Sequence, residues 1–232
     1  LHLSIRRQRQ MCIRDRWAHD VEIAPFSIAR APVTQAEFAA FVDDGGYARR
    51  ELWTPEGWTW RHEVCAEHPL YWRRGDDGWE RRVFDRWVSI ASQPHRPVLH
   101  VSAHEAEAWC VWAGRRLPTE AEWERASAGA SVGRRENLDM RVGETVDVAA
   151  FPEGDSACGC RQMIGNVWEW TTTTFGPYPG YVRDPYAEYS EPWFGNHRVL
   201  RGGCFVTRAR LLRPSWRNFY TPDRRDVWSG FR

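Results

Sequence analysis

The segment "GRRLPTEAEWE", residues 114–124, contains the strongest signal for the fold. Thr119 followed by Glu122 has the spacing of a capping box, in which each side chain bonds the backbone amide of the other residue at a helix start. The residues after Thr119, "EAEWERASA", then predict a helix. Gly114 is typical of the residue that ends a preceding helix. The segment therefore predicts two short helices joined by a short loop.

The same start signal occurs twice more upstream. Ser102 with Glu105 opens "AHEAEAWCVWAG", which ends at Gly114. Thr34 with Glu37 opens "TQAEFAAFVDDGG", which carries an apolar stripe and stops at a glycine pair. We therefore expect three short helices, each with its own N-terminal cap.

The strand signals are shorter and lie mostly late in the chain. Residues 21–30 alternate and predict a strand, and an Asp-Asp-Gly turn at 76–78 favours short strands on either side. Residues 128–163 are typical of loops. From residue 164 onward, short strands are expected in "GNVWEWTTTTF", "RVLRGGCFV" and "WSGFR". The pattern predicts an α+β fold with much irregular structure.

Length and composition indicate one globular domain. The 232 residues are 42% hydrophobic, and no run of about 18 apolar residues predicts a membrane span. The 15 Trp residues favour a fold held by aromatic packing. Every one of the 32 basic residues is Arg, which indicates GC-rich codon usage and a bacterial source.

The first 16 residues, "LHLSIRRQRQMCIRDR", differ from the rest of the chain, and "QRQMCIRDR" resembles translated sequencing-adapter DNA. We expect residues 1–16 to be a non-native leader, with the domain at 17–232 and natural sequence continuing upstream of Trp17. The leader holds five of the 32 basic and one of the 31 acidic residues, so the remainder carries a net charge of about −3. A nucleic-acid partner is therefore not expected.

Five cysteines lie outside the leader, and no secretory signal is visible, which favours a reducing cytoplasm. The pair in "CGC", Cys158 and Cys160, suits either a metal or redox site or two ordinary thiols. In "IGNVWEW", Glu169 lies between two Trp residues. Such a carboxylate suits either calcium, which prefers oxygen ligands, or an ion pair with an arginine.

The last third of the chain is rich in aromatic residues interleaved with polar ones, as in "RNFYTPDRRDVWSGFR", residues 217–232. Aromatic faces can enclose a quaternary ammonium group, and Asn218 or an arginine can hold a carboxylate. The alternative is that these aromatics only form the core of the loops.

Several motifs together resemble the sulfatase-modifying-factor, or formylglycine-generating-enzyme, family. They are "APVTQAEFAAFV", "PVLHVSAHEAEAWCVWAGRRLPTEAEWE", "GNVWEWT", "RVLRGGCF" and "GFR". The resemblance runs from about Trp17 to Arg232 and implies the irregular C-type-lectin-like α+β fold of that family. Formylglycine-generating enzymes carry two catalytic cysteines that fall at about Thr207 and Leu212 here, so cysteine oxidation on sulfatases is not expected.

The segments "PYPGY", "DPYAEYSEPWFGNHRVLRGG" and "RNFYTPDRRDVWSGFR" are instead similar to the C-terminal domain of ergothioneine synthases and their selenoneine relatives. The resemblance implies an oxidoreductase that uses iron(II) and oxygen to join sulfur or selenium to hercynine. It places the iron in an N-terminal domain that this chain lacks, so the fragment alone is expected to be inactive. The alternatives are a non-catalytic lectin-like binding module, a formylglycine-generating oxidase, or a calcium-stabilised structural domain of another modular enzyme.

The resemblance also implies site residues. Hercynine would be bound by Tyr178, Trp193, Phe194, Arg217, Asn218, Phe219 and Tyr220. Tyr186 or Tyr189 would act as an acid in the oxidative step. The family's calcium loop would correspond to Gln162, Gly165, Val167 and Glu169. The small-molecule substrates would be hercynine and a sulfur or selenium donor.

Overall fold

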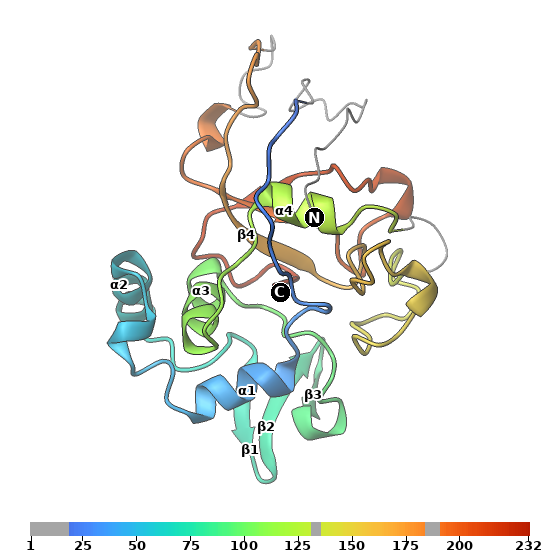
Figure 1. The fold of residues 1–232 in the computed structure, drawn as a ribbon. Coiled ribbons are helices and arrows are strands. Elements are labelled where there is room, and N and C mark those ends of the chain that lie inside the picture. Colours follow the sequence, from blue (N-terminus) through green and yellow to red (C-terminus); the bar gives the residue numbers. More distant parts are fainter. Residues whose placement is uncertain (1–18, 131–135, 184–190) are drawn as a thin grey trace.

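The computed structural model describes residues 19–130, 136–183 and 191–232, in which short helices and two small sheets are joined by long irregular segments (Figure 1). The helices are α1 (Gln35–Asp43), α2 (Pro55–Glu63), α3 (Ala103–Trp112) and α4 (Glu120–Ala126). The strands are β1 (Trp72–Gly75), β2 (Gly78–Val83), β3 (Arg86–Ser89), β4 (Trp168–Thr174), β5 (Arg198–Arg201), β6 (Asn218–Tyr220) and β7 (Ser229–Gly230). The expected mixed and largely irregular architecture is confirmed.

The three expected helices begin where their capping boxes predict. Thr34, Ser102 and Thr119 each accept a hydrogen bond from the backbone of the residue three positions later, and the glutamate there returns the bond. Helix α2 was not expected, although Thr54 caps it and Pro55 occupies its first turn. Its apolar signal is weak because Trp60 and Gly57 are its only buried residues.

The predicted strand at 21–30 is wrong. Residues 21–29 form no strand, because no neighbouring segment pairs with them. Regular contacts begin a little later, where Val33 N donates to Phe231 O at 2.8 Å and Val33 O accepts from Val98 N at 2.9 Å. The alternation of polar and apolar residues was therefore not sufficient without a partner strand.

The two sheets differ in strand order and in the direction of strand pairing. The first is an antiparallel sheet of order β1-β2-β3, whose β1–β2 hairpin turns at the expected acidic segment, next to α1 (Figure 1). The second has the order β6-β5-β4-β7, with β4 paired antiparallel to β5 and parallel to β7. In this second sheet β6 is an edge strand, and its three residues pair with Arg198, Val199 and Leu200 of β5.

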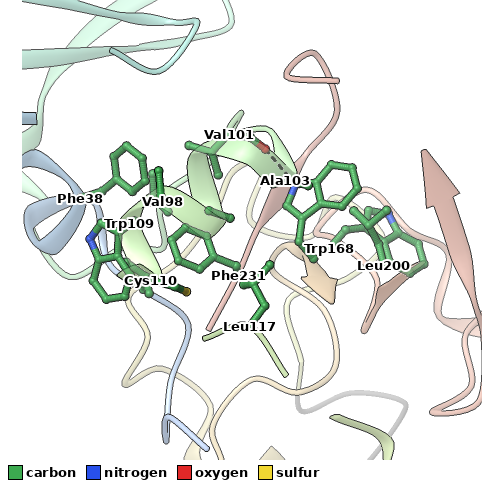
Figure 2. Close-up of a cluster of buried hydrophobic side chains, with 14 of the residues drawn as sticks. Phe38, Val98, Val101, Ala103, Trp109, Cys110, Leu117, Trp168, Leu200 and Phe231 are labelled. Carbon is green, nitrogen blue, oxygen red and sulfur yellow. Dashed lines mark hydrogen bonds between the residues drawn. The ribbon is translucent and has the colours of Figure 1, made fainter. Parts of the chain in front are cut away.

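The core joins residues from the whole length of the described chain. Phe231 is fully buried and contacts Phe38 of α1 and Trp109 of α3 edge-on, with ring centroids 6.1 and 5.4 Å apart (Figure 2). Trp170 of β4 donates its indole N–H to Val101 O at 2.9 Å. The final residues therefore close the core around which α1, α3 and β4 pack. Within the described ranges, no helix has the length and apolar character needed to cross a bilayer.

Candidate functional site

Strand β6 carries three of the predicted substrate-binding residues, Asn218, Phe219 and Tyr220, and all three are partly exposed. Successive residues of a strand face opposite sides of a sheet, so Asn218 and Tyr220 share one face and Phe219 occupies the other. Asn218 Oδ1 accepts a hydrogen bond from Phe219 N at 3.0 Å. Tyr220 contacts the guanidinium of Arg224, which lies 5.2 Å from its ring centroid.

Phe219 belongs to an aromatic cluster formed by Phe175, Trp193, Phe194, His197 and Phe219. Phe219 stacks face to face on Phe175, with centroids 4.0 Å apart and an interplanar angle of 13°. His197 meets Phe219 edge-on at 5.5 Å. The structure thus brings together the predicted residues Trp193, Phe194 and Phe219, through Phe175 and His197, which the sequence did not single out.

His197 supplies the cluster with a polar ring. Burial lowers its pKa below the ordinary value, although the negative charge of Asp223 opposes this effect. The imidazole is therefore neutral at pH 7. Its Nδ1 lies 2.6 Å from Asn196 Oδ1, which fixes the ring orientation. A neutral ring at this position adds no positive charge that would repel a cationic ligand.

Arg217 lies beneath the aromatic cluster and is only 3% exposed. Its Nε is 2.7 Å from Glu120 Oε1, and its Nη1 donates to Gly176 O at 3.0 Å. The guanidinium lies 4.9 Å from the ring centroid of Phe175 and 4.3 Å from that of Tyr178. Arg217 is therefore engaged in positioning other side chains.

Glu120 of α4 links the base of the site to the core. Its Oε1 accepts from Arg201 Nη1 at 2.5 Å and from the Tyr178 hydroxyl at 3.2 Å, in addition to its contact with Arg217. Arg201 also pairs with Glu124 at 2.5 Å. Burial would lower the pKa of the fully buried Arg201, but the two carboxylates raise it overall. Arg201 therefore remains charged, and its charge is balanced locally.

Sequence reasoning missed Glu120, Phe175 and His197. Glu120 was visible only as a residue in the first turn of a helix, and nothing in its neighbourhood in the sequence points to arginines that are 81 and 97 residues away. Phe175 follows a run of four threonines that gives no sign of a ligand site. The predicted catalytic residues Tyr186 and Tyr189 lie outside the described residues.

Three of the four expected calcium ligands, Gln162, Gly165 and Glu169, are engaged in other contacts. Arg232 holds both carboxylate oxygens of Glu169, with Nη2–Oε1 and Nε–Oε2 distances of 2.6 Å, and Trp123 Nε1 also donates to Oε2 at 2.7 Å. Gln162 Oε1 accepts from Asn166, and the Gly165 carbonyl accepts from Val167 N. A cation would have to displace a guanidinium from a fully buried carboxylate. These residues do not fit calcium, and the arginine ion pair that the sequence left open is present.

Iron was expected in a separate domain, and the described residues offer no ligand set for it. Within residues 19–130, 136–183 and 191–232, no three His, Cys, Asp or Glu side chains gather in a way that could hold a metal ion. His100, for example, directs its Nδ1 to Arg225 O at 3.2 Å.

Residues 6–232 match the family model described as the sulfatase-modifying factor enzyme 1-like domain. The chain belongs to this family. The match begins within residues 1–16, the expected leader, and the boundary at residue 17 stays a prediction. The family carries several activities, which its relatives illustrate.

A hercynine oxygenase of Mycobacterium tuberculosis is 42% identical over 234 residues, which cover 94% of this chain and 54% of that protein. The chain thus spans about half the length of the curated relatives that carry this name. A formylglycine-generating enzyme of Streptomyces coelicolor is 30% identical over 92% of the chain and 79% of its own length. Among solved structures, PvdO from Pseudomonas aeruginosa has a TM-score of 0.63 at 23% identity, covering 94% of this chain and 84% of that one. This last likeness shows a shared fold.

Thr207 and Leu212 stand where the cysteine pair of formylglycine-generating enzymes is expected. Thr207 Oγ1 accepts a hydrogen bond from Cys204 N at 3.0 Å, and Leu212 is 4% exposed within the core. Cys204 itself is buried, and burial raises the pKa of its thiol. Neither position provides a thiol for oxidation chemistry.

Proposed function

We propose that this domain binds hercynine and serves an iron- and oxygen-dependent enzyme that joins sulfur or selenium to the imidazole ring of hercynine. The proposal rests on 42% identity to a protein named hercynine oxygenase over 94% of the chain. It also rests on the aromatic cluster, whose chemistry suits this substrate. We place the enzyme in a reducing bacterial cytoplasm, in keeping with its unpaired cysteines.

The observation that carries the proposal is the Phe219–Phe175 stack with Trp193 and His197 beside it. Hercynine carries a trimethylammonium group, which is attracted to aromatic faces because their π-systems are negative at the centre. Trp193 is 40% exposed, so its indole is accessible to a ligand. His197 is neutral at pH 7 and adds no positive charge, and the guanidinium of Arg217 against Phe175 is paired with the Glu120 carboxylate.

Asn218 would orient the opposite end of the substrate. Because β6 is an edge strand in the described sheet, its outer edge is not covered by another strand. A ligand at this edge can contact Phe219 on one face of the strand and Asn218 on the other. The trimethylammonium group would then lie against Phe219, while the Asn218 amide donates to the carboxylate or contacts the imidazole. Tyr220, on the Asn218 face, would limit the space left for the sulfur or selenium donor.

Arg217, Glu120 and Tyr178 would act beneath the substrate as positioning residues. Arg217 is ion-paired with the Glu120 side chain and donates to the backbone carbonyl of Gly176, the residue after Phe175, so it ties this part of the aromatic cluster to α4. Iron(II) would activate oxygen, and the residues that hold it would lie outside the described part of the chain. Tyr186 or Tyr189 remains our candidate for the acid in that step.

Two other functions are less well supported. A formylglycine-generating oxidase would need the cysteine pair that Thr207 and Leu212 replace. A non-catalytic lectin-like module would bind a ligand without any turnover, and the aromatic cluster alone does not distinguish it from the proposed enzyme. Binding of hercynine, with specificity for the trimethylammonium group, tests the site on which the proposed enzyme depends.

Isothermal titration of the chain with hercynine, and with histidine as the matched ligand that lacks the three methyl groups, tests the proposal. Phe219→Leu keeps an apolar side chain but removes the π face, and should weaken hercynine affinity roughly 5- to 30-fold. Phe205→Leu is the matched control, because Phe205 packs edge-on against Trp228 outside the aromatic cluster. Equal affinity for histidine and hercynine, or equal losses in the two variants, would contradict the proposal.

A further inference from the structure

Cys158 and Cys160 lie close together at a tight turn, apart from the aromatic cluster. Their Sγ atoms are 3.5 Å apart and both thiols are free. The turn is closed by hydrogen bonds from Ser156 N to Cys160 O at 2.9 Å and from Gly159 N to Ser156 O at 2.8 Å. Gly159 has φ +81°, a conformation that favours glycine and that brings the two flanking side chains to one side.

The two thiols differ in access and in acidity. Cys158 is exposed, whereas Cys160 is only 4% exposed. Burial would raise the pKa of Cys158, but hydrogen bonds with Ser156 and Cys160 outweigh it and lower the pKa overall. Burial raises the pKa of Cys160 to about 11. At pH 7 a thiol with that pKa is ionised in on the order of one molecule in 10⁴. Cys158 is therefore the nucleophile of the pair, since the thiolate is the reactive form.

Ser156 is placed to support the Cys158 thiolate. Its Oγ lies 3.3 Å from Cys158 Sγ and accepts a hydrogen bond from Cys160 N at 3.1 Å. The Ser156 hydroxyl also has one proton to donate, and that proton can be directed to the Cys158 sulfur. Such a bond stabilises the charged form of the thiol.

We propose that Cys158 and Cys160 form a thiol–disulfide exchange site whose substrates are low-molecular-weight disulfides. The Cys158 thiolate attacks one sulfur of the external disulfide, forms a mixed disulfide and releases the first small thiol, which takes up the proton lost by Cys158. Cys160 then loses its proton as its sulfur attacks Cys158 Sγ, and the second small thiol leaves with that proton. The protein pair is oxidised by two electrons, and one external disulfide is reduced to two thiols.

The geometry allows the second step without a large rearrangement. A disulfide bond is about 2.05 Å long, so the sulfur atoms need to approach by about 1.5 Å. Gly159 between them can absorb this movement because it lacks a Cβ, and no other heavy atom lies within 4 Å of the position that a Cβ would take.

The test uses the whole chain incubated at pH 7 with mixtures of oxidised and reduced glutathione, quenched with acid, alkylated and mapped by mass spectrometry. In the unchanged sequence, the peptide with Cys158 and Cys160 should lose two hydrogens and resist alkylation. Cys160→Ser should trap glutathione on Cys158, and Cys158→Ser should leave Cys160 unmodified. Because Cys160 is buried, Cys160→Ala provides a second variant should the serine fail to fold.

Cys65 is the internal control, because it is also exposed and its Sγ contacts only His62 O among the hydrogen bonds of the described residues. It should form at most a glutathione adduct that persists. Ser156→Ala should move the pH profile of Cys158 alkylation to higher pH, which a purely structural role would not do. Free alkylation of both thiols at every glutathione ratio, or a glutathione adduct that stays on Cys158 in the unchanged chain, would overturn the proposal. Neither outcome depends on hercynine binding.

Discussion

Glu169 and Arg232 hold each other through two hydrogen bonds of 2.6 Å, although 63 residues separate them in the sequence. Both side chains are almost completely buried, at 1% and 4% exposure. Arg232 also donates to the carbonyl of Arg161 at 2.9 Å. The pair therefore fastens the last residue of the chain to the central strand β4.

Removal of one member of this pair should be costly. Arg232→Met leaves a buried carboxylate without its cation and should lower the free energy of unfolding by about 3–5 kcal/mol. Glu169→Gln with Arg232→Met removes both charges while the amide still accepts from Trp123, so the double variant should be more stable than Arg232→Met. Urea unfolding of the single and double variants measures this coupling. Equal stability of Arg232→Met and the double variant would contradict the expected cost of an unpaired buried carboxylate.

The same ion pair predicts how the protein responds to calcium. Because the carboxylate of Glu169 is bound to Arg232 and Trp123, removal of calcium with a chelator should leave the thermal unfolding midpoint unchanged. Differential scanning calorimetry with added calcium or chelator provides the measurement. A calcium-dependent rise in the midpoint that Glu169→Gln abolishes would contradict this prediction.

Two glutamates of α4 allow a matched comparison of carboxylates whose arginine partners are buried in one case and exposed in the other. Glu120→Gln leaves Arg201 and Arg217 short of a negative charge in the interior and should cost about 3 kcal/mol or more. Glu122→Gln is the control, because its partner Arg116 is 61% exposed and glutamine is also accepted in a capping box. The control should cost less than about 1 kcal/mol.

Urea unfolding distinguishes these two cases, and titration with hercynine adds a second measurement. Because Glu120 holds Arg217 and Tyr178 beneath the aromatic cluster, Glu120→Gln should also weaken hercynine binding under conditions where the variant is fully folded. If the two glutamine variants lose equal stability, the buried cluster does not carry the charge interaction described above.

His100 should make stability depend on pH. Burial lowers its pKa to about 4, whereas an unfolded histidine has a pKa near 6.5. The unfolded chain therefore binds more protons between these values, so stability is lost as the pH falls from about 6.5 towards 4, by on the order of 3 kcal/mol. His100→Asn suits the residue's positive φ of 63° and should flatten this slope. Urea midpoints measured from pH 4 to pH 7 test the prediction, and an unchanged slope would contradict it.

Signals that act within a few residues could be predicted from the sequence. The capping boxes at Thr34, Ser102 and Thr119 depend only on a hydroxyl and a carboxylate three positions apart, and all three helices start there. The β1–β2 hairpin follows in the same way from its acidic turn. By contrast, residues 21–29 alternate as a strand does, yet they find no neighbour with which to pair.

The candidate site depends on contacts that no local pattern records. Phe219 was predicted from a family resemblance, but its stacking partner Phe175 lies 44 positions earlier and gave no signal. Glu169 was recognised as unusual because a carboxylate between two tryptophans needs a cation, and the sequence could not decide between a metal and an arginine. Arg232 decides that question through a contact across the fold.

The parallel pairing of β7 with β4 also affects how the protein folds during its synthesis on the ribosome. Residues 229 and 230 form the edge strand β7 of the second sheet, next to β4. Phe231 lies in the middle of the core (Figure 2). While those residues are still inside the ribosomal tunnel, α1, α3 and β4 have no Phe231 to enclose. The hydrophobic core can therefore close only after residue 232 has emerged, and the nascent chain must keep its tryptophan-rich surfaces from associating until then.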